Sequence, residues 1–400
     1  MSEPLSPAVP DPAPDYRSRL PALTGLRFFA ALCVFFVHAF FLVDPLKPTV
    51  PLSFFGDPGV ANFLATLFGK SGYLGVTFFF VLSGFVLTWS ARPGERVTAF
   101  WRRRIVKIFP NHVVMWAAAM VLYASAFTPV GTWLANLLLV HSYFPQPSVF
   151  ISVNSLSWTL CCELLFYLLF PLIIRPVRRI AEHRLWLWAG VMIAGMVGVE
   201  LVTVFVIPDH PGSPMLAVSV PQQWFGYIFP PPRLFEFVLG MVLARLVRAG
   251  RWPRVGVAPA AALAVIGFFV TNAVPSPFDF TVSAVIPIGV LICATAAADV
   301  RGTRTFLRSR VMVWLGNVSF GFYLCQGVVL FYGRLAIVGD GTFSTPVAIL
   351  LHLGFFGLTL LAGWLLYALV EQPMMRRFAR NRRRVPAPTE PVAVDGVASA

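Results

Sequence analysis

The chain has 400 residues, of which 58% are hydrophobic and only 12% are charged, and its formal net charge is +14. A soluble protein with so few charged residues could not cover its own surface, so the composition predicts a chain that faces lipid. It excludes a soluble enzyme and a nucleic-acid-binding module. The five cysteines lie in apolar runs without a CxxC pair, which excludes a disulfide framework and a zinc site.

Ten apolar stretches are long enough to cross a bilayer as helices, which takes about 20 residues each. We therefore predict an all-α membrane bundle with spans at roughly 22–42, 73–91, 109–127, 155–175, 185–207, 232–247, 255–273, 280–298, 313–333 and 346–370. The sixth span is short and could begin near Trp224. We expect one membrane domain over 17–377, a disordered head at 1–16, and a basic and then disordered tail at 378–400.

The lysine and arginine residues alternate between the segments that connect the spans. With the N-terminus inside, 26 of the 31 fall in cytoplasmic segments, and Arg27 and Arg233 fall within spans. Only Lys47, Lys70 and Arg334 fall in outer loops. The positive-inside rule therefore predicts that both termini are cytoplasmic and that the chain is a multi-pass protein of the cell's inner membrane.

Two ionisable residues of the first span share one helix face. Arg27 and His38 are eleven residues apart, which is about 20° past three full turns and about 16 Å along the axis. Taken singly, they could be an interfacial arginine and a hydrogen-bonded histidine inside the bundle. Together they favour a polar cavity, because charged groups within spans are costly and usually functional. Arg27 would lie toward the cytoplasm and His38 in the outer half.

Later spans contain three acidic residues and a second arginine. Glu163 lies two to three turns inside the outer end of its span, so we expect it near the depth of His38, where a carboxylate can orient a histidine. A partner role for a buried arginine is the alternative. Arg233 and Glu236, spaced i and i+3, could pair with each other or bind substrate. Glu200 has no nearby motif, and we expect it to have a packing role.

A basic run, Phe100–Pro110, enters the third span from the cytoplasm. Its charges could simply be topology signals at an inner helix end. They could also bind phosphate, since arginine binds it bidentately and lysine as a point charge. No P-loop and no dinucleotide-binding glycine motif accompanies them, so nucleotide hydrolysis has no support.

The order and spacing of several segments resemble the membrane-bound acyltransferase family 3, bacterial O-acyltransferases with about ten spans, from about residue 20 to 377. The matching segments are Leu23–Arg27 with His38, Gly75–Phe85, Leu156–Trp158 followed by Glu163–Tyr167 and Pro171, Arg233–Phe237, and Glu371–Pro373. Two positions depart from the family pattern. Arg104-Ile-Val-Lys107 replaces its Arg-x-x-Arg, and Gln326 stands where many relatives have histidine.

The resemblance implies transfer of an acyl group, commonly acetyl, to a hydroxyl of a sugar or other acceptor. It implies acyl-coenzyme A as co-substrate, with no permanently bound cofactor and no metal. We expect Arg27, Arg104 and Lys107 to bind the donor. His38 would act as general base with Glu163 orienting it, and transient acylation of His38 is the alternative.

The expected partners are the lipid bilayer, acyl-coenzyme A and a hydroxyl-bearing acceptor, with no nucleic acid. An envelope polysaccharide, a lipid-linked sugar or a glycosylated natural product would each fit as acceptor. Trp158, Arg233 and Glu236 are candidates for substrate binding or structural support. A second class of function is a secondary transporter or a flippase of a lipid-linked sugar, with His38 and Glu163 as a proton relay. The paired broken helices typical of transporters are not evident in the sequence.

Overall fold

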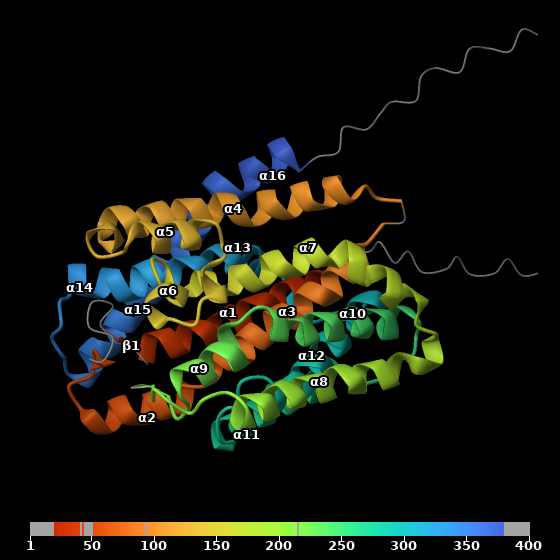
Figure 1. The fold of residues 1–400 in the computed structure, drawn as a ribbon, viewed down its shortest axis with the longest axis horizontal. Helices are drawn as coiled ribbons and strands as arrows, with labels where there is room; N and C mark the ends of the chain where they lie inside the picture. The colour runs from red at the N-terminus through yellow and green to blue at the C-terminus, as the bar shows by residue number, and fades with distance from the viewer. Residues whose placement is uncertain (1–19, 41, 44–50, 93, 214–215, 380–400) are drawn as a thin grey trace, which may run out of the picture.

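Long helices that lie side by side along one direction form the bundle of the computed structural model (Figure 1). The structure describes residues 20–379 except 41, 44–50, 93 and 214–215. The predicted head and nearly all of the predicted tail lie outside these residues. The prediction of an all-α membrane bundle is confirmed.

Each of the ten predicted spans overlaps one of the longer helices. These are α1 (Pro21–Phe40), α3 (Ser71–Ser90), α4 (Val97–Leu122), α7 (Trp158–Arg179), α8 (Leu185–Phe205), α10 (Leu234–Arg248), α11 (Val257–Ala273), α12 (Val282–Val300), α13 (Arg310–Gln326) and α15 (Thr345–Leu366). Within the described residues, nine helical segments are long and apolar enough to cross a membrane, and α11 is a shorter apolar helix of 17 residues.

Short elements connect or extend these helices. The α-helical ones are α2 (Pro58–Phe68), α5 (Val130–Leu137), α6 (Pro147–Phe150), α9 (Val220–Gln223), α14 (Gly333–Ile337) and α16 (Gln372–Phe378). The π-helical turns are η5 (Trp224–Ile228), η8 (Gly327–Tyr332) and η9 (Tyr367–Glu371). The 3₁₀ turns are η1 (Ala124–Ala126), η2 (His141–Tyr143), η3 (Ser155–Ser157), η4 (Glu182–Arg184), η6 (Pro231–Arg233) and η7 (Phe306–Arg308). Two short antiparallel strands, β1 (Leu42–Val43) and β2 (Pro51–Leu52), complete the described elements.

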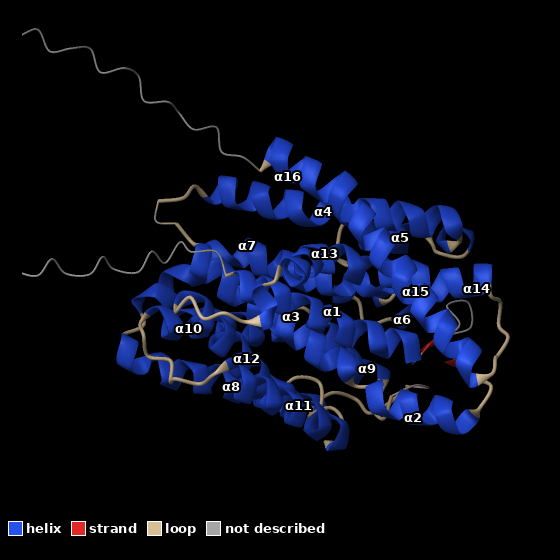
Figure 2. Ribbon diagram, turned by 180° about the vertical axis from the view of Figure 1, so that it is seen from behind, coloured by secondary structure: helices blue, strands red, loops and turns tan. Residues whose placement is uncertain are grey.

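The bundle has a central group of helices with others on both sides. Figures 1 and 2 show α4, α5 and α16 along one side, α8, α11 and α12 along the opposite side, and α1, α3, α7, α10 and α13 between them. In the centre, α3 packs against α10 and α1, and α1 packs against α13. The elements α2, β1 and α14 lie together at one end of the bundle (Figure 1).

Two glycines bring α3 and α10 into direct backbone contact. A Cβ atom added at Gly84 would lie 1.8 Å from the carbonyl oxygen of Phe237, and one added at Gly240 would lie 1.9 Å from that of Val81. Neither position can hold a larger residue without moving a helix. Small residues at such crossings are typical of membrane helix packing, because lipid supplies no hydrophobic force between helices.

Two buried carboxylates cap the starts of distant helices. Glu200 Oε1 accepts hydrogen bonds from the Thr281 hydroxyl at 2.7 Å and from the Thr281 and Val282 amides at 3.2 Å, where α12 begins. Asp299 accepts from the Ala22 amide at 2.9 Å and the Leu23 amide at 3.2 Å, where α1 begins. These amides have no partner within their own helices. The packing role expected of Glu200 is therefore a helix cap.

One predicted boundary is wrong. Helix α4 begins at Val97 rather than near 109, and it continues through Pro110 to Leu122. Hydropathy located the apolar part of this helix but missed its charged first turns, which are helical as well. Arg104 and Lys107 consequently lie on the helix itself instead of in a loop before it. Helix α4 packs beside α7, η9 and α16.

Candidate active site

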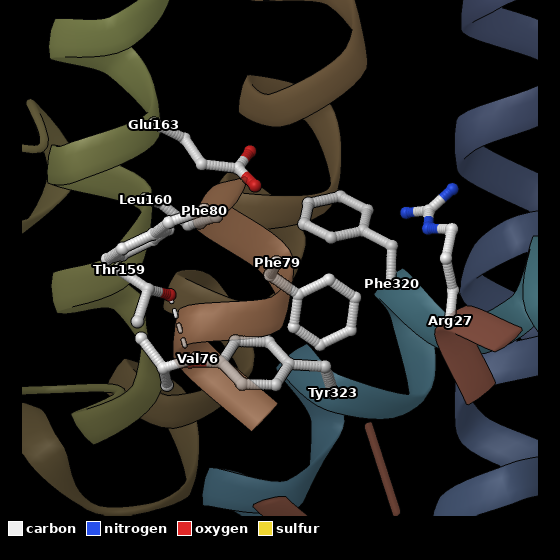
Figure 3. Close-up of a pocket in the computed structure, with 9 residues that line it drawn as sticks. All are labelled: Arg27, Val76, Phe79, Phe80, Thr159, Leu160, Glu163, Phe320 and Tyr323. Carbon is white, nitrogen blue, oxygen red and sulfur yellow. Dashed lines mark hydrogen bonds between the residues drawn. The ribbon is translucent and has the colours of Figure 1, made fainter. Parts of the chain in front are cut away.

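Arg27 and Glu163 face one small cavity inside the bundle. The cavity has a volume of about 30 Å³ and lies between α1, α3, α7 and α13. Its lining residues are Arg27, Val76, Phe79, Phe80, Thr159, Leu160, Glu163, Phe320 and Tyr323. Figure 3 shows the rings of Phe79 and Phe320 between the Glu163 carboxylate and the Arg27 guanidinium. A cavity of this volume is large enough to hold at least one water molecule.

Hydrogen bonds fix the polar wall of this cavity. The Tyr167 hydroxyl donates to Glu163 Oε2 at 3.0 Å, one helical turn along α7. The hydroxyls of Thr159 and Tyr323 lie 2.9 Å apart (Figure 3).

Arg27 contributes an uncommitted cation to this cavity. Among the residues that the structure describes, no hydrogen-bond or ion-pair partner is found for its guanidinium. The cavity therefore contains a carboxylate with a fixed hydroxyl partner and a cation free to bind a ligand group.

His38 faces α13, as Arg27 does, but its partner is not Glu163. Its Nδ1 lies 3.0 Å from Gln326 Oε1 at the end of α13, and the Phe331 ring stands edge-on to the imidazole at a centroid distance of 5.7 Å. Helical spacing correctly predicted that His38 and Arg27 share a face of α1. The expectation that Glu163 shares the depth of His38 and contacts it is wrong.

The physical reason is the offset between α1 and α7. His38 lies close to the end of α1 at Phe40, whereas Arg27 lies about 16 Å along the axis toward its start. Glu163 lines its cavity with Arg27, so its depth is that of the arginine. Counting residues from predicted helix ends does not fix such an offset, because the ends themselves are uncertain.

Lys107 is paired with a carboxylate from the end of the chain. Its Nζ is bonded to Glu371 Oε1, and the second carboxylate oxygen of Glu371 accepts from Asn111 Nδ2 at 3.0 Å. Glu371 is almost fully buried. The charge that the sequence analysis assigned to the donor is therefore engaged in joining α4 to η9.

Arg104 lies beside a second, basic cavity. Its guanidinium lies over the rings of Phe100 and Tyr167, 5.6 and 5.8 Å from their centroids. The cavity has a volume of about 300 Å³ where α3 ends and α4 begins. Its lining residues are Leu87, Ser90, Ala91, Arg92, Glu95, Phe100, Arg103, Arg104 and Ala379. Within this cavity, Glu95 forms an ion pair with Arg103 at 2.5 Å. The other two arginines of the lining, Arg92 and Arg104, do not take part in that ion pair.

Arg233 and Glu236 pair with each other, which confirms the structural alternative. Arg233 Nε lies 2.8 Å from Glu236 Oε2, and Arg233 Nη2 donates to Glu236 Oε1 at 3.1 Å. Both side chains are buried, and the guanidinium lies over the rings of Phe80 and Tyr227. Trp158 packs on Tyr227 at a centroid distance of 4.9 Å. Phe80 also lines the small cavity, so this cluster supports the cavity wall from behind.

A buried histidine outside the long helices belongs to a separate network. His141 in η2 has Nε2 at 3.2 Å from the Ser157 hydroxyl and Nδ1 at 3.4 Å from Cys161 Sγ. Burial lowers the pKa of His141 to about 3, and nearby His112 acts in the same direction. The Ser157 hydroxyl donates to the Asn154 carbonyl at 2.6 Å. Because this network is fully buried, it fixes a loop and is closed to substrate.

Sequence reasoning missed three residues that complete the site. Gln326 stood out only as a departure from the family pattern, and Phe79 and Phe320 looked like ordinary apolar residues. Their positions depend on how α3 and α13 pack against α1. Within the described residues, no group of three or more histidine, cysteine, aspartate or glutamate side chains could hold a metal ion.

Comparison with known proteins gives matches along almost the whole chain. A family model described as an acyltransferase domain matches residues 20–368. The chain is 40% identical over 383 residues to the acyltransferase MdmB of Streptomyces mycarofaciens, covering 92% of this chain and 95% of that protein. No solved structure matches the chain.

Two more distant relatives have names that refer to polysaccharides. Peptidoglycan O-acetyltransferase OatA of Listeria monocytogenes is 23% identical over 345 residues, covering 77% of this chain and 49% of that protein. Exopolysaccharide production protein ExoZ of Rhizobium meliloti is 26% identical over 322 residues, covering 78% of this chain and 92% of that protein.

Proposed function

Because the chain belongs to the membrane-bound acyltransferase family 3, we propose that it transfers an acetyl or other short acyl group from acyl-coenzyme A to a hydroxyl. The acceptor would be a carbohydrate or a glycosylated natural product. The observation that supports this best is the shared cavity of Arg27 and Glu163, with His38 further along the same face of α1. The names of two relatives, which refer to peptidoglycan and exopolysaccharide, favour a sugar hydroxyl.

The donor would enter from the cytoplasmic side of the inner membrane. The segments richest in arginine, which we place in the cytoplasm by the positive-inside rule, include the start of α4. The basic cavity at this end offers arginines to the phosphates of the nucleotide part. From there the long arm of the donor would pass Arg27 and Glu163 toward His38.

Arg27 and Glu163 suit the chemistry of that arm. The arm of coenzyme A contains amide groups, whose carbonyls accept from a guanidinium and whose N–H groups donate to a carboxylate. We therefore assign Glu163 to contact with the donor arm instead of contact with His38. Arg104 would bind donor phosphate, and Lys107 would hold the entrance together through Glu371.

The transfer step balances with these groups alone. His38 takes the proton of the acceptor hydroxyl as its oxygen attacks the thioester carbonyl, so that a C–O bond forms. The C–S bond then breaks, and the thiolate leaves as coenzyme A after receiving the proton from the imidazolium. The products are the acyl ester of the acceptor and free coenzyme A.

The test is transfer of label from acetyl-coenzyme A in membranes that contain the protein. Native protein should label an acceptor and release coenzyme A thiol in equal amount. His38→Gln, with matched expression and retained donor binding, should lower the rate by about 10²–10⁴-fold, the usual contribution of general-base catalysis. His183→Gln is the matched control, because His183 is exposed at a turn between helices. If His38→Gln keeps more than a tenth of the activity, the base assignment fails.

The acceptor is identified by a difference in mass. Metabolites and envelope sugars from cells with and without the gene should differ by one acyl group on one compound. A gain of about 42 Da marks acetyl on a hydroxyl. No acylated product in any fraction, together with substrate flux across the membrane, would support the transporter alternative instead.

A further inference from the structure

Gln326 holds His38 through a two-step hydrogen-bond chain. Its Oε1 lies 3.0 Å from His38 Nδ1, and its Nε2 donates to the carbonyl oxygen of Ala31 at 3.3 Å. The side chain of Gln326 is fully buried at the end of α13. The amide thus bridges two positions of α1 that are seven residues apart.

The hydrogen bond from Gln326 to Ala31 determines the direction of the hydrogen bond between Gln326 and His38. A backbone carbonyl can only accept, so the amide must turn its NH₂ group toward Ala31. Its oxygen then faces His38, and this oxygen can also only accept. His38 Nδ1 must therefore carry a hydrogen. A neutral imidazole with its hydrogen on Nδ1 has its lone pair on Nε2.

We propose that Gln326 is a positioning residue that holds His38 as the Nδ1-protonated tautomer, so that Nε2 is the atom that accepts the proton of the acceptor hydroxyl. The proposal rests on the proposed function, since it requires His38 to be the base. Glu163 was the residue expected to orient His38, and the structure assigns this task to an uncharged amide instead.

The packing of α13 on α1 keeps Gln326 in place. A Cβ added at Gly316 would lie 1.9 Å from the Thr24 carbonyl oxygen, so the two backbones touch near the other end of the helix pair. Phe322, one turn before Gln326, packs on the rings of Phe28 and Phe35 of α1 at centroid distances of 5.6 Å. The amide therefore meets His38 from a helix that cannot shift relative to α1 without steric overlap.

The other titratable groups on the surrounding elements are engaged elsewhere. His352 on α15 has its ring nitrogens at 2.7 and 3.2 Å from the carbonyls of Ala348 and Ala39. Arg334 in α14 donates to the Ser53 and Gly341 carbonyls. Tyr73 on α3 packs on the rings of Tyr227 and Phe280, and the Tyr323 hydroxyl on α13 lies at Thr159.

Among the described residues, Gln326 is the one hydrogen-bond partner of His38. No salt bridge to His38 is found in the described part of the chain. The amide sets the tautomer and places no charge beside the ring.

The experiment compares Gln326→Leu and Gln326→Glu with native protein in the labelled-transfer assay over a range of pH. Gln326→Leu removes the acceptor at similar size, and kcat should fall about 10–100-fold, the loss seen when a metal-bound histidine loses the hydrogen-bond partner of its other ring nitrogen. The apparent KM for acetyl-coenzyme A should not change. Gln326→Glu keeps an acceptor oxygen, so it should retain more activity than Gln326→Leu at high pH.

The pH profile separates positioning from a purely structural role. The carboxylate of Gln326→Glu stabilises the protonated imidazole, so as pH falls activity should be lost at a higher pH than in native protein. In a His38→Gln background, Gln326→Leu should cause no further loss, because the two residues act as one unit. Thermal unfolding of each variant in detergent shows whether it is folded.

Three outcomes overturn the inference. These are full kcat in folded Gln326→Leu, a pH profile of Gln326→Glu that superposes on the native one, and additive losses in the double variant. If Gln326→Leu does not fold, the Gln326→Glu profile decides alone. An active His38→Gln variant would instead overturn the base assignment, whereas an inactive His38→Gln with a fully active Gln326→Leu would overturn only the role of Gln326.

Discussion

Lys107 on α4 forms an ion pair with Glu371, 264 residues later in the chain. Asn111, one turn after the lysine, binds the other oxygen of the same carboxylate. Three polar groups thus connect the basic first half of α4 to the turn η9 that follows α15. The lysine that replaces the second arginine of the family pattern has a structural partner.

Lys107→Ala should destabilise the protein, because it leaves the buried Glu371 carboxylate without its cation. Breaking a buried pair on one side typically costs about 3–5 kcal/mol. Denaturant unfolding in detergent measures this loss. The double variant Lys107→Met, Glu371→Gln removes both charges and should be less destabilised than Lys107→Ala. An unchanged unfolding curve for Lys107→Ala, with a raised KM for the acyl donor, would return the residue to the donor site.

Glu163→Gln should slow acyl transfer while the protein remains folded. The substitution keeps an acceptor for the Tyr167 hydroxyl but removes the charge that faces Arg27 across the cavity. We expect about a 10-fold loss, the equivalent of about 1.4 kcal/mol, seen mainly in the apparent KM for acyl-coenzyme A. Tyr167→Phe is the control, because it keeps the charge and removes only the hydrogen bond. Equal losses in both variants would show that the hydrogen bond, and not the charge, matters.

The ten helices were predictable because the bilayer fixes the length of an apolar helix, and each predicted span overlaps one. The shared face of Arg27 and His38 was predictable for a similar reason, since helical periodicity is local. The start of α4 was not, because its first turns contain arginines that a hydropathy criterion rejects. Charged helical turns at a membrane surface look like a loop when only apolar residues are counted.

Reporter fusions test the proposed sidedness. Fusions after residues 100 and 180 should report the cytoplasm, and fusions within 208–231 should report the outside, because the basic segments are held inside. The positive control is a fusion to the C-terminal tail, which the same rule places in the cytoplasm. A cytoplasmic signal from a fusion near residue 220 would contradict the predicted orientation of the bundle in the membrane. It would also exclude entry of the donor at Arg104.

Glu200→Ala should destabilise the protein by about 1–3 kcal/mol, because buried donors at the start of α12 lose their acceptor. Glu200→Gln keeps an acceptor oxygen and should lose less. Asp209→Ala is the matched control, since Asp209 is an exposed acid soon after α8, the helix that contains Glu200. Thermal unfolding in detergent ranks the three variants. If Glu200→Ala unfolds like native protein, the carboxylate does not cap α12.

His141 should make the protein less stable as pH falls below about 6.5. Its pKa is lowered by burial to about 3 in the folded state, from 6.5 when exposed. The unfolded chain therefore binds a proton first, and the folded state loses about 1.4 kcal/mol per pH unit between these two values. Above pH 6.5 the effect is absent. Denaturant unfolding at pH 7.5 and 5.5 should show a smaller difference in His141→Asn than in native protein. Equal differences would mean that His141 is not buried in its neutral form.

The partners of His38 and Glu163 could not be predicted from the sequence. Each lies on a different helix, and their relative depth depends on how far α7 is displaced along α1, which no local pattern records. The i, i+3 pair of Arg233 and Glu236 was predictable because both residues are on one turn. Gln326 was visible only as an unusual residue, since its role depends on contacts with Ala31 and His38 across a helix interface.

The backbone contact between α3 and α10 limits which parts of the bundle can move during turnover. Because Gly84 and Gly240 leave no space between these helices, one cannot slide along the other. On the proposed donor route, a cavity of about 30 Å³ has to admit an arm many times that volume. The rings of Phe79 and Phe320 line this cavity, and their rotation, which takes picoseconds to nanoseconds when exposed and longer when packed, would enlarge it. Such an opening would be an aromatic side-chain rotation, in contrast to the helix displacements by which transporters alternate.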